Sequence, residues 1–400
     1  MKIKDLKIKT SWTIIIFGFF AFQEKTSWPL LRFSGIRSFS FFTDLGWVFK
    51  TADSARLIGW DIYSPNPPRD YSAYIYGSNL IRAVNFLGIT EAQTKIIGWV
   101  LMLAFSILIS IVMTQLNFNR FLSLVLCFAL FISPPNQLLL ERGNFDIVII
   151  VVLALISYLI VLDKYYLPLC LLFLITLFKF YTLPLYIYLI YLSKSKLNRL
   201  NGIFLMSITT VLVINDLGKI KINFPRPSWA AFGNPIFGLY FHRFRIDLPS
   251  LIQDVIGLIS LALALIIIKA LLKNQKIELP KTSILKKPIN FKDSIFSTYI
   301  IIFLICYFSS TNFDYRLIYL IIPALIYINM LESNRFMYAT LGVMLFLSGW
   351  LSYNSGDLQL LGDLCILFWV GIFVRSILIE LQSTALAKNK FLKVISASLI

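Results

Sequence analysis

The sequence is poor in charge, because only 14% of its 400 residues are Asp, Glu, Lys or Arg, whereas a soluble domain carries about a quarter. Hydrophobic residues make up 58% of the chain and gather in long runs, for example over residues 145–162, 251–272 and 359–374. This composition excludes a soluble globular enzyme, a disordered chain and a disulfide-stapled secreted module. It predicts an all-α integral membrane protein, since barrel strands show weak alternation and not solid apolar blocks.

Residues that ligate metals through sulfur or imidazole are scarce. The chain has one histidine and four cysteines, and it contains no Asp-x-Asp motif. The cysteines lie inside apolar runs, which excludes a disulfide framework and a zinc-type cluster and favours packing between helices. They are Cys127, Cys170, Cys306 and Cys365. The missing Asp-x-Asp disfavours a metal-bound nucleotide site, so we expect neither a metal nor a cofactor.

Twelve apolar stretches are candidate membrane spans, although several are shorter than the roughly 17–25 residues that a span needs. The sequence therefore predicts a polytopic helical bundle of about 11–13 transmembrane helices. No internal repeat and no soluble domain is found, so residues 1–400 are expected to form a single transmembrane domain. The stretches cover residues 12–22, 96–115, 121–133, 145–162, 165–178, 180–192, 203–214, 251–272, 294–308, 317–331, 336–351 and 359–374.

The net charge of +17 is explained by membrane topology. When the spans alternate across the membrane, one set of connecting segments holds 19 Lys and Arg residues and the short loops of the other set hold 3. The positive-inside rule places the basic set in the cytoplasm, together with both termini and the Lys-rich loop at about 273–293. Membrane lipids are therefore expected as partners and nucleic acid is not. The abundance of Ile, Lys, Phe and Asn suggests an AT-rich bacterial genome. We therefore expect a multi-pass protein of the bacterial inner (plasma) membrane.

Two long loops, at about 23–94 and 216–250, are predicted on the extracytoplasmic face. Binding and catalytic residues often lie in such loops. In the first, Thr43 is expected to cap a helix that runs through Ala55 and carries Asp44 in its first turn. Asp44 is either a general base near the lipid boundary or only a partner of the helix dipole. Spacing alone favours the second interpretation.

Three segments, in this order along the chain, resemble the GT-C superfamily of glycosyltransferases, and more narrowly glycosyltransferase family 87, whose members use polyprenyl-phosphate-mannose. The first is Asp44 after the opening span, followed by a helix with small residues and then Gly59-Trp60-Asp61-Ile62-Tyr63-Ser64-Pro65. The second is Glu141-Arg142-Gly143-Asn144-Phe145-Asp146 leading into a span, with Phe178-Lys179-Phe180-Tyr181-Thr182-Leu183-Pro184 after it. The third is Asn312-Phe313-Asp314-Tyr315-Arg316-Leu317, which leads into a span that carries Pro323.

This resemblance implies a sugar donor linked to polyprenyl phosphate and a glycan or glycolipid acceptor that meet on the extracytoplasmic face. It assigns the role of general base to Asp44. A carboxylate within hydrogen-bond reach would assist a sugar hydroxyl as it attacks the anomeric carbon. The leaving group is a phosphomonoester anion, which requires cations and hydrogen-bond donors.

Candidate substrate-binding residues are the polar side chains at the outer face. His242, the only histidine, either contacts phosphate or has a structural role, and the neighbouring Arg243 and Arg245 either contact phosphate or attract lipid headgroups. Lys179 either binds phosphate or extends its ammonium to the interface. The remaining candidates lie at two helix starts, where local capping and pairing also explain them: Arg142, Asn144, Asp146, Asp314 and Arg316.

The sequence thus predicts a membrane glycosyltransferase that transfers mannose, another hexose or a pentose. One alternative is an outer-leaflet polysaccharide polymerase or ligase, which would take an oligosaccharide from a diphosphate carrier. Another is a transporter or flippase. Transporters place charges at the bilayer midplane and often contain repeats, whereas the ionisable site candidates here lie toward the outer face, with Lys269, Asp363 and Arg375 as the main intramembrane exceptions.

Overall fold

The protein is described by a computed structural model in which two compact units are distinguished. Unit 1 holds residues 1–117 and 137–225, and unit 2 holds residues 118–136 and 226–400. The structure describes residues 10–26, 41–59, 62–63, 77–116, 125–126, 129, 133–219, 231–233, 236–239, 246, 248–274, 284–309, 312–331, 334–351 and 357–383.

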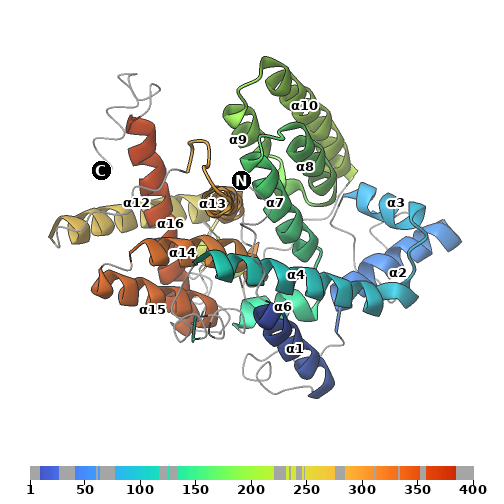
Figure 1. Cartoon of the computed structure of the whole chain (residues 1–400), viewed down its shortest axis with the longest axis horizontal. Coiled ribbons are helices and arrows are strands. Elements are labelled where there is room, and N and C mark those ends of the chain that lie inside the picture. The colour runs from blue at the N-terminus through green and yellow to red at the C-terminus, as the bar shows by residue number, and fades with distance from the viewer. Residues whose placement is uncertain are drawn as a thin grey trace. The chain divides into compact units, whose positions relative to one another are not determined.

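All secondary-structure elements among the described residues of unit 1 are helices (Figure 1). Helix α1 packs on α4, α4 on α7, α7 on α8, and both α8 and α9 on α10, while α2 lies against α3 and the start of α4. Helix α6 (Pro134–Glu141) begins in unit 2 and ends in unit 1. The elements are α1 (Thr10–Thr26), α2 (Thr43–Ile58), α3 (Ser78–Phe86), η3 (Glu91–Gln93), α4 (Thr94–Leu116), α7 (Asp146–Val161), α8 (Tyr166–Phe178), η4 (Phe180–Thr182), α9 (Leu185–Leu192) and α10 (Lys196–Lys219).

Among the described residues of unit 2, the elements are helices and two short strands that pair antiparallel, with Ala231 opposite Phe313. Its helices pack as α11 on α12, α12 on α16, α16 on α15, α15 on α14 and α14 on α13. The elements are β1 (Ala231–Phe232), α11 (Ile236–Leu239), α12 (Ser250–Asn274), α13 (Phe291–Ser309), β2 (Asn312–Phe313), η6 (Asp314–Leu317), α14 (Ile318–Met330), α15 (Arg335–Leu351) and α16 (Asp357–Ser383).

The core of unit 2 is aromatic. Tyr327 of α14 packs against Trp369 and Phe373 of α16 with ring centroids 6.2 Å apart in each pair, and Phe296 of α13 stacks on Tyr327 at 6.5 Å. Such edge-to-face and offset pairs add to the free energy gained by burying the rings. Near the C-terminal end of α16, the buried Glu380 carboxylate accepts hydrogen bonds from three successive backbone N–H groups, those of residues 284–286. This contact anchors the described part of the predicted Lys-rich loop.

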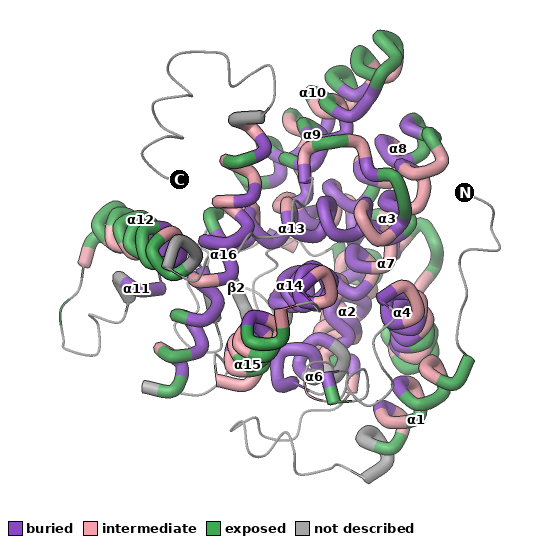
Figure 2. The backbone as a smooth tube through the Cα atoms, turned by 60° about the vertical axis from the view of Figure 1, so that its left-hand side comes forward, coloured by how far each residue is buried: buried purple, intermediate pink, exposed green. Residues whose placement is uncertain are grey.

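The described chain contains five helices that are long and apolar enough to cross a membrane, together with six shorter apolar helices. The five lie at Glu91–Leu116, Lys196–Lys219, Ser250–Leu271, Phe291–Ser309 and Leu358–Leu381. Only 22% of the residues in the most apolar part of α10, and 28% of those in α12, are buried by protein, against 72% in α13. Figure 2 shows the difference in burial along these helices. Exposed Leu and Ile side chains along α10 and α12 suit contact with lipid tails. The chain is a helical membrane protein, as its composition predicts.

The predicted spans differ from the helices mainly at their ends. The stretch at 180–192 begins with the η4 turn, and α9 starts only after Pro184. Proline is tolerated at the start of a helix, but it has no N–H to continue a helix that is already under way. Helix α10 extends well beyond the predicted 203–214, because hydrogen bonding continues past the apolar residues. Most of the stretch at 121–133 lies outside the described residues.

Several helix ends share one side of unit 1. The first turn of α2 lies near the start of α4, since a Cβ at Gly46 would be 3.4 Å from Thr94. The N–H of Asp44 binds the carbonyl of Arg142, just before α7, and the start of α3 binds Asp216 in the last turn of α10. The predicted alternation of spans assigns these ends to the extracytoplasmic side.

Candidate functional site

The backbone at the start of α2 places Asp44. Phe42 precedes the helix in a left-handed conformation (φ 66°, ψ 31°), and its ring is 1% exposed. A Cβ on Gly98 would lie 2.4 Å from that ring, and Gly143 also has positive φ (+58°) and contacts Phe42. These two glycines therefore leave the room that the Phe42 ring occupies.

The predicted cap by Thr43 is wrong, although the predicted helix and its first-turn Asp44 are present. The structure has Phe42 at the cap position and no side-chain hydrogen bond there. Instead, the carbonyl oxygen of Arg142 accepts the N–H groups of Asp44 at 2.8 Å and Leu45 at 3.3 Å. The carbonyl of a distant segment thus satisfies N–H groups that a cap would otherwise bind.

The Asp44 carboxylate contacts two polar side chains and keeps 22% of its side chain exposed. Its Oδ2 accepts a hydrogen bond of 2.7 Å from Asn144 Nδ2, and its Oδ1 lies 3.4 Å from Arg142 Nη1. Burial raises the pKa of Asp44 above the ordinary 3.8, while Arg142, the Asn144 hydrogen bond and Lys179 act against that rise. A raised pKa makes this carboxylate a stronger proton acceptor than an ordinary aspartate.

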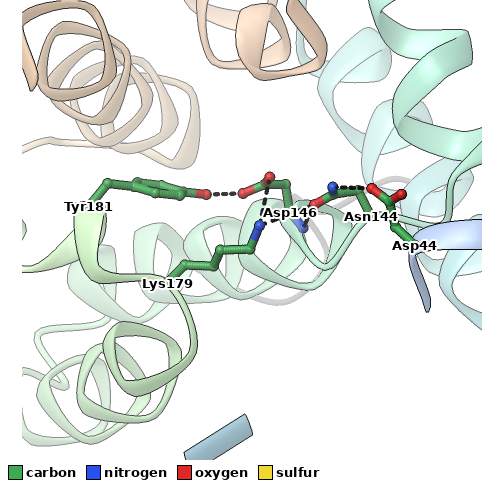
Figure 3. A network of polar contacts seen from close by, with 5 residues as sticks. All are labelled: Asp44, Asn144, Asp146, Lys179 and Tyr181. Atoms are coloured by element: carbon green, nitrogen blue, oxygen red, sulfur yellow. Dashed lines mark hydrogen bonds and ion pairs between the residues drawn. The ribbon is translucent and has the colours of Figure 1, made fainter. Parts of the chain in front are cut away.

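Asn144 connects Asp44 to a buried ion pair (Figure 3). Its Oδ1 accepts the backbone N–H of Asp146 at 3.1 Å and Lys179 Nζ at 3.3 Å. Because Oδ1 faces two donors, the Nδ2 side of the amide faces the Asp44 carboxylate. The Asn144 side chain thus binds the N–H of the first residue of α7, although Phe145 and not Asn144 occupies the cap position.

Asp146 and Lys179 form the ion pair at the start of α7 and the end of α8. Lys179 Nζ lies 3.4 Å from Asp146 Oδ2, with side chains 3% and 0% exposed. The Tyr181 hydroxyl, from η4, donates to Asp146 Oδ1. A buried pair of charges carries a large desolvation cost, which good geometry and further hydrogen bonds offset. We call Asp44, Arg142, Asn144, Asp146, Lys179 and Tyr181 the Asp44 network.

Five predicted site residues therefore come together from three segments distant in sequence. Tyr181 joins them, although no role for it was predicted from the sequence. Its position two residues after Lys179, in a segment that interrupts two apolar runs, is the signal that would have identified it. Arg142 has a half-exposed side chain beside Asp44, whereas Lys179 is buried against Asn144 and Asp146.

The five remaining predicted site residues lie either outside the described residues or in unit 2. His242, Arg243 and Arg245 lie outside the described residues. Asp314 and Arg316 lie in η6 of unit 2, and Arg316 is half-buried. Within the described residues, no group of three or more His, Cys, Asp or Glu side chains is placed to hold a metal ion.

A second polar contact joins the two predicted outer loops. Asp216 is 2% exposed and accepts both the N–H of Ser78 at 2.9 Å and its hydroxyl at 2.8 Å. Tyr63 lies in the same cluster, where burial and the Asp216 charge raise the pKa of its phenol. Asp216 thus satisfies the start of α3 and ties it to the end of α10.

Comparisons of the chain with protein-family models, with curated proteins and with solved structures find no match.

Proposed function

We propose that this protein is an integral-membrane glycosyltransferase that transfers a sugar from a polyprenyl-phosphate donor to a cell-envelope glycan or glycolipid. The sugar is mannose, another hexose or a pentose. The proposal includes a GT-C-like bundle of about 11–13 spans in a bacterial plasma membrane, both termini in the cytoplasm and the Asp44 network on the extracytoplasmic side.

The single observation that carries the proposal is the setting of Asp44. This carboxylate is partly exposed beside a half-exposed guanidinium, and it is held by an amide whose orientation a buried ion pair fixes. A general base and a cation side by side suit a reaction in which a hydroxyl loses a proton and a phosphate gains charge.

In the proposed reaction, Asp44 takes the proton of an acceptor hydroxyl while the hydroxyl oxygen bonds to the anomeric carbon of the donor sugar. The bond between that carbon and the carrier's phosphate oxygen breaks, and polyprenyl monophosphate leaves with the electron pair. Arg142 is placed to stabilise the departing phosphate, because a guanidinium has five N–H donors and can bind Asp44 and a phosphate oxygen together. His242, Arg243, Arg245, Asp314 and Arg316 remain proposed as further substrate contacts.

The location among helix ends also supports a lipid-linked donor. Asp44 lies on a helix that is not itself apolar enough to be a span, at the ends of α4, α7 and α8. A carrier whose chain lies in the bilayer presents its phosphate and sugar at that level.

A donor panel tests the function. Purified protein in proteoliposomes is given an envelope extract as acceptor and one radiolabelled donor at a time: a monosaccharide on polyprenyl monophosphate, or an oligosaccharide on polyprenyl diphosphate. We expect label to enter the acceptor only from the monophosphate donor, with polyprenyl monophosphate released. Use of the diphosphate donor alone would indicate a polymerase or ligase. Movement of a carrier between leaflets without any transfer would indicate a flippase.

A further inference from the structure

Three members of the Asp44 network, Asn144, Asp146 and Lys179, are too deeply buried to contact a substrate. Asp146 and Lys179 are 0% and 3% exposed, and Asn144 is 1% exposed. The Lys179 ammonium is held by Asn144 Oδ1 and Asp146 Oδ2, so it is bound to protein rather than presented to a phosphate. Phosphate binding was one role predicted for Lys179 from the sequence, and this geometry supports a different one.

These inner contacts control how Asn144 faces Asp44. An amide has a donor side and an acceptor side, and it can present either one to a neighbour by turning over. Here Lys179 and the Asp146 N–H hold the acceptor side, which leaves the donor side toward the Asp44 carboxylate at 2.7 Å. Tyr181 and Lys179 in turn hold the two oxygens of Asp146 (Figure 3).

We propose that Asp146, Lys179 and Tyr181 are positioning residues that act through Asn144 and hold the donor side of its amide toward Asp44. Their role in a reaction depends on the proposed function, whereas their effect on Asp44 does not. No substrate contact is required of them.

The direction of the effect follows from the charges and donors that act on Asp44. Arg142, Lys179 and the Asn144 N–H favour its ionised form, and Asp146 opposes it. Removing the Tyr181 hydroxyl leaves Asp146 Oδ1 with one donor fewer, so Lys179 is drawn toward Asp146 and away from Asn144. The amide then holds Asp44 less firmly, and the pKa of Asp44 rises.

The test follows the protonation of Asp44 without any sugar donor. Dicyclohexylcarbodiimide, an apolar reagent, adds to protonated carboxyl groups, and peptide mapping by mass spectrometry identifies the labelled residue. The full-length protein in detergent micelles is labelled across a pH series, and the midpoint of the loss of Asp44 labelling is measured. Access to the reagent changes the labelling rate, whereas the ionisation of Asp44 changes the midpoint.

We expect Tyr181→Phe to move this midpoint to higher pH. Tyr191→Phe, which removes a hydroxyl from the exposed Tyr191 of α9, should leave it unchanged. Lys179→Met should raise the midpoint further, and Lys179→Arg should restore it toward the wild-type value because charge and donors are kept. If Tyr181→Phe does not fold, Lys179→Met carries the test, with Lys179→Arg as its matched control.

An unchanged midpoint in folded Tyr181→Phe and Lys179→Met would overturn the positioning role. This failure is distinct from failure of the proposed function. A protein that transfers no sugar can still show the shift, and an active transferase can lack it.

Discussion

At the scale of single residues, the position of Asp44 depends on how Phe42 is accommodated. Phe42 has a left-handed backbone, which is uncommon for a bulky residue, and its ring fills the space beside Gly98 and Gly143. The conformation is therefore maintained by packing. Because Phe42 precedes Asp44 by two residues, a displaced ring would also displace the carboxylate.

Gly98→Ala should be destabilising, because the new Cβ would lie 2.4 Å from the Phe42 ring and the ring would have to move. We expect a loss of about 1–3 kcal/mol in the free energy of unfolding, measured by denaturant titration in detergent. Gly18→Ala in α1 is the matched control, since nothing lies within 4 Å of its Cβ. Equal stability of the two variants would show that the ring is not confined.

The chemical types of the site residues were more predictable from the sequence than the contacts that hold them. Asp44, Asn144, Asp146 and Lys179 are identifiable because polar residues beside long apolar runs are costly and need partners. The left-handed Phe42 was not predictable, since it depends on Gly98, which lies far away in sequence. For the same reason the start of α2 was assigned to Thr43 and not to the carbonyl of Arg142.

At the scale of elements, α3 is held at its start by Asp216 of α10. The sequence predicted an extracytoplasmic loop there, and the described part of that loop contains the helical elements α2, α3 and η3. Helix α3 has only nine residues, so its stability must come from tertiary contacts and capping.

Asp216→Asn should loosen α3, because the amide keeps only one of the two acceptor oxygens that bind Ser78. We expect a loss of about 1–3 kcal/mol in local stability, seen as faster hydrogen–deuterium exchange in peptides that cover residues 78–86. The comparison is Asp53→Asn on α2, which leaves the Asp216 contact intact. Unchanged exchange in α3 would contradict the anchoring role of Asp216.

At the scale of the whole molecule, the sequence predicted a helical membrane protein because the apolar runs are long and nearly free of charge. It predicted the ends of the helices less well, since helical hydrogen bonds extend into polar residues, as in α10. The orientation in the membrane is a prediction from the distribution of Lys and Arg.

Cysteine labelling tests this orientation. In a variant whose four native cysteines are replaced by Ala, Arg82→Cys on α3 should react with a membrane-impermeant maleimide added to intact cells. Lys164→Cys, in the exposed turn between α7 and α8, should react only after the membrane is permeabilised. The reverse pattern would place the Asp44 network in the cytoplasm.

The role of Asp44 as general base is tested by the rate of sugar transfer by Asp44→Asn in proteoliposomes. We predict a loss of about 10²–10⁴-fold, with Asp53→Asn on the same helix close to wild type. Because burial raises the pKa of Asp44, the wild-type rate should fall on acidification already above pH 3.8. Near-normal transfer by a correctly folded Asp44→Asn variant would contradict the account.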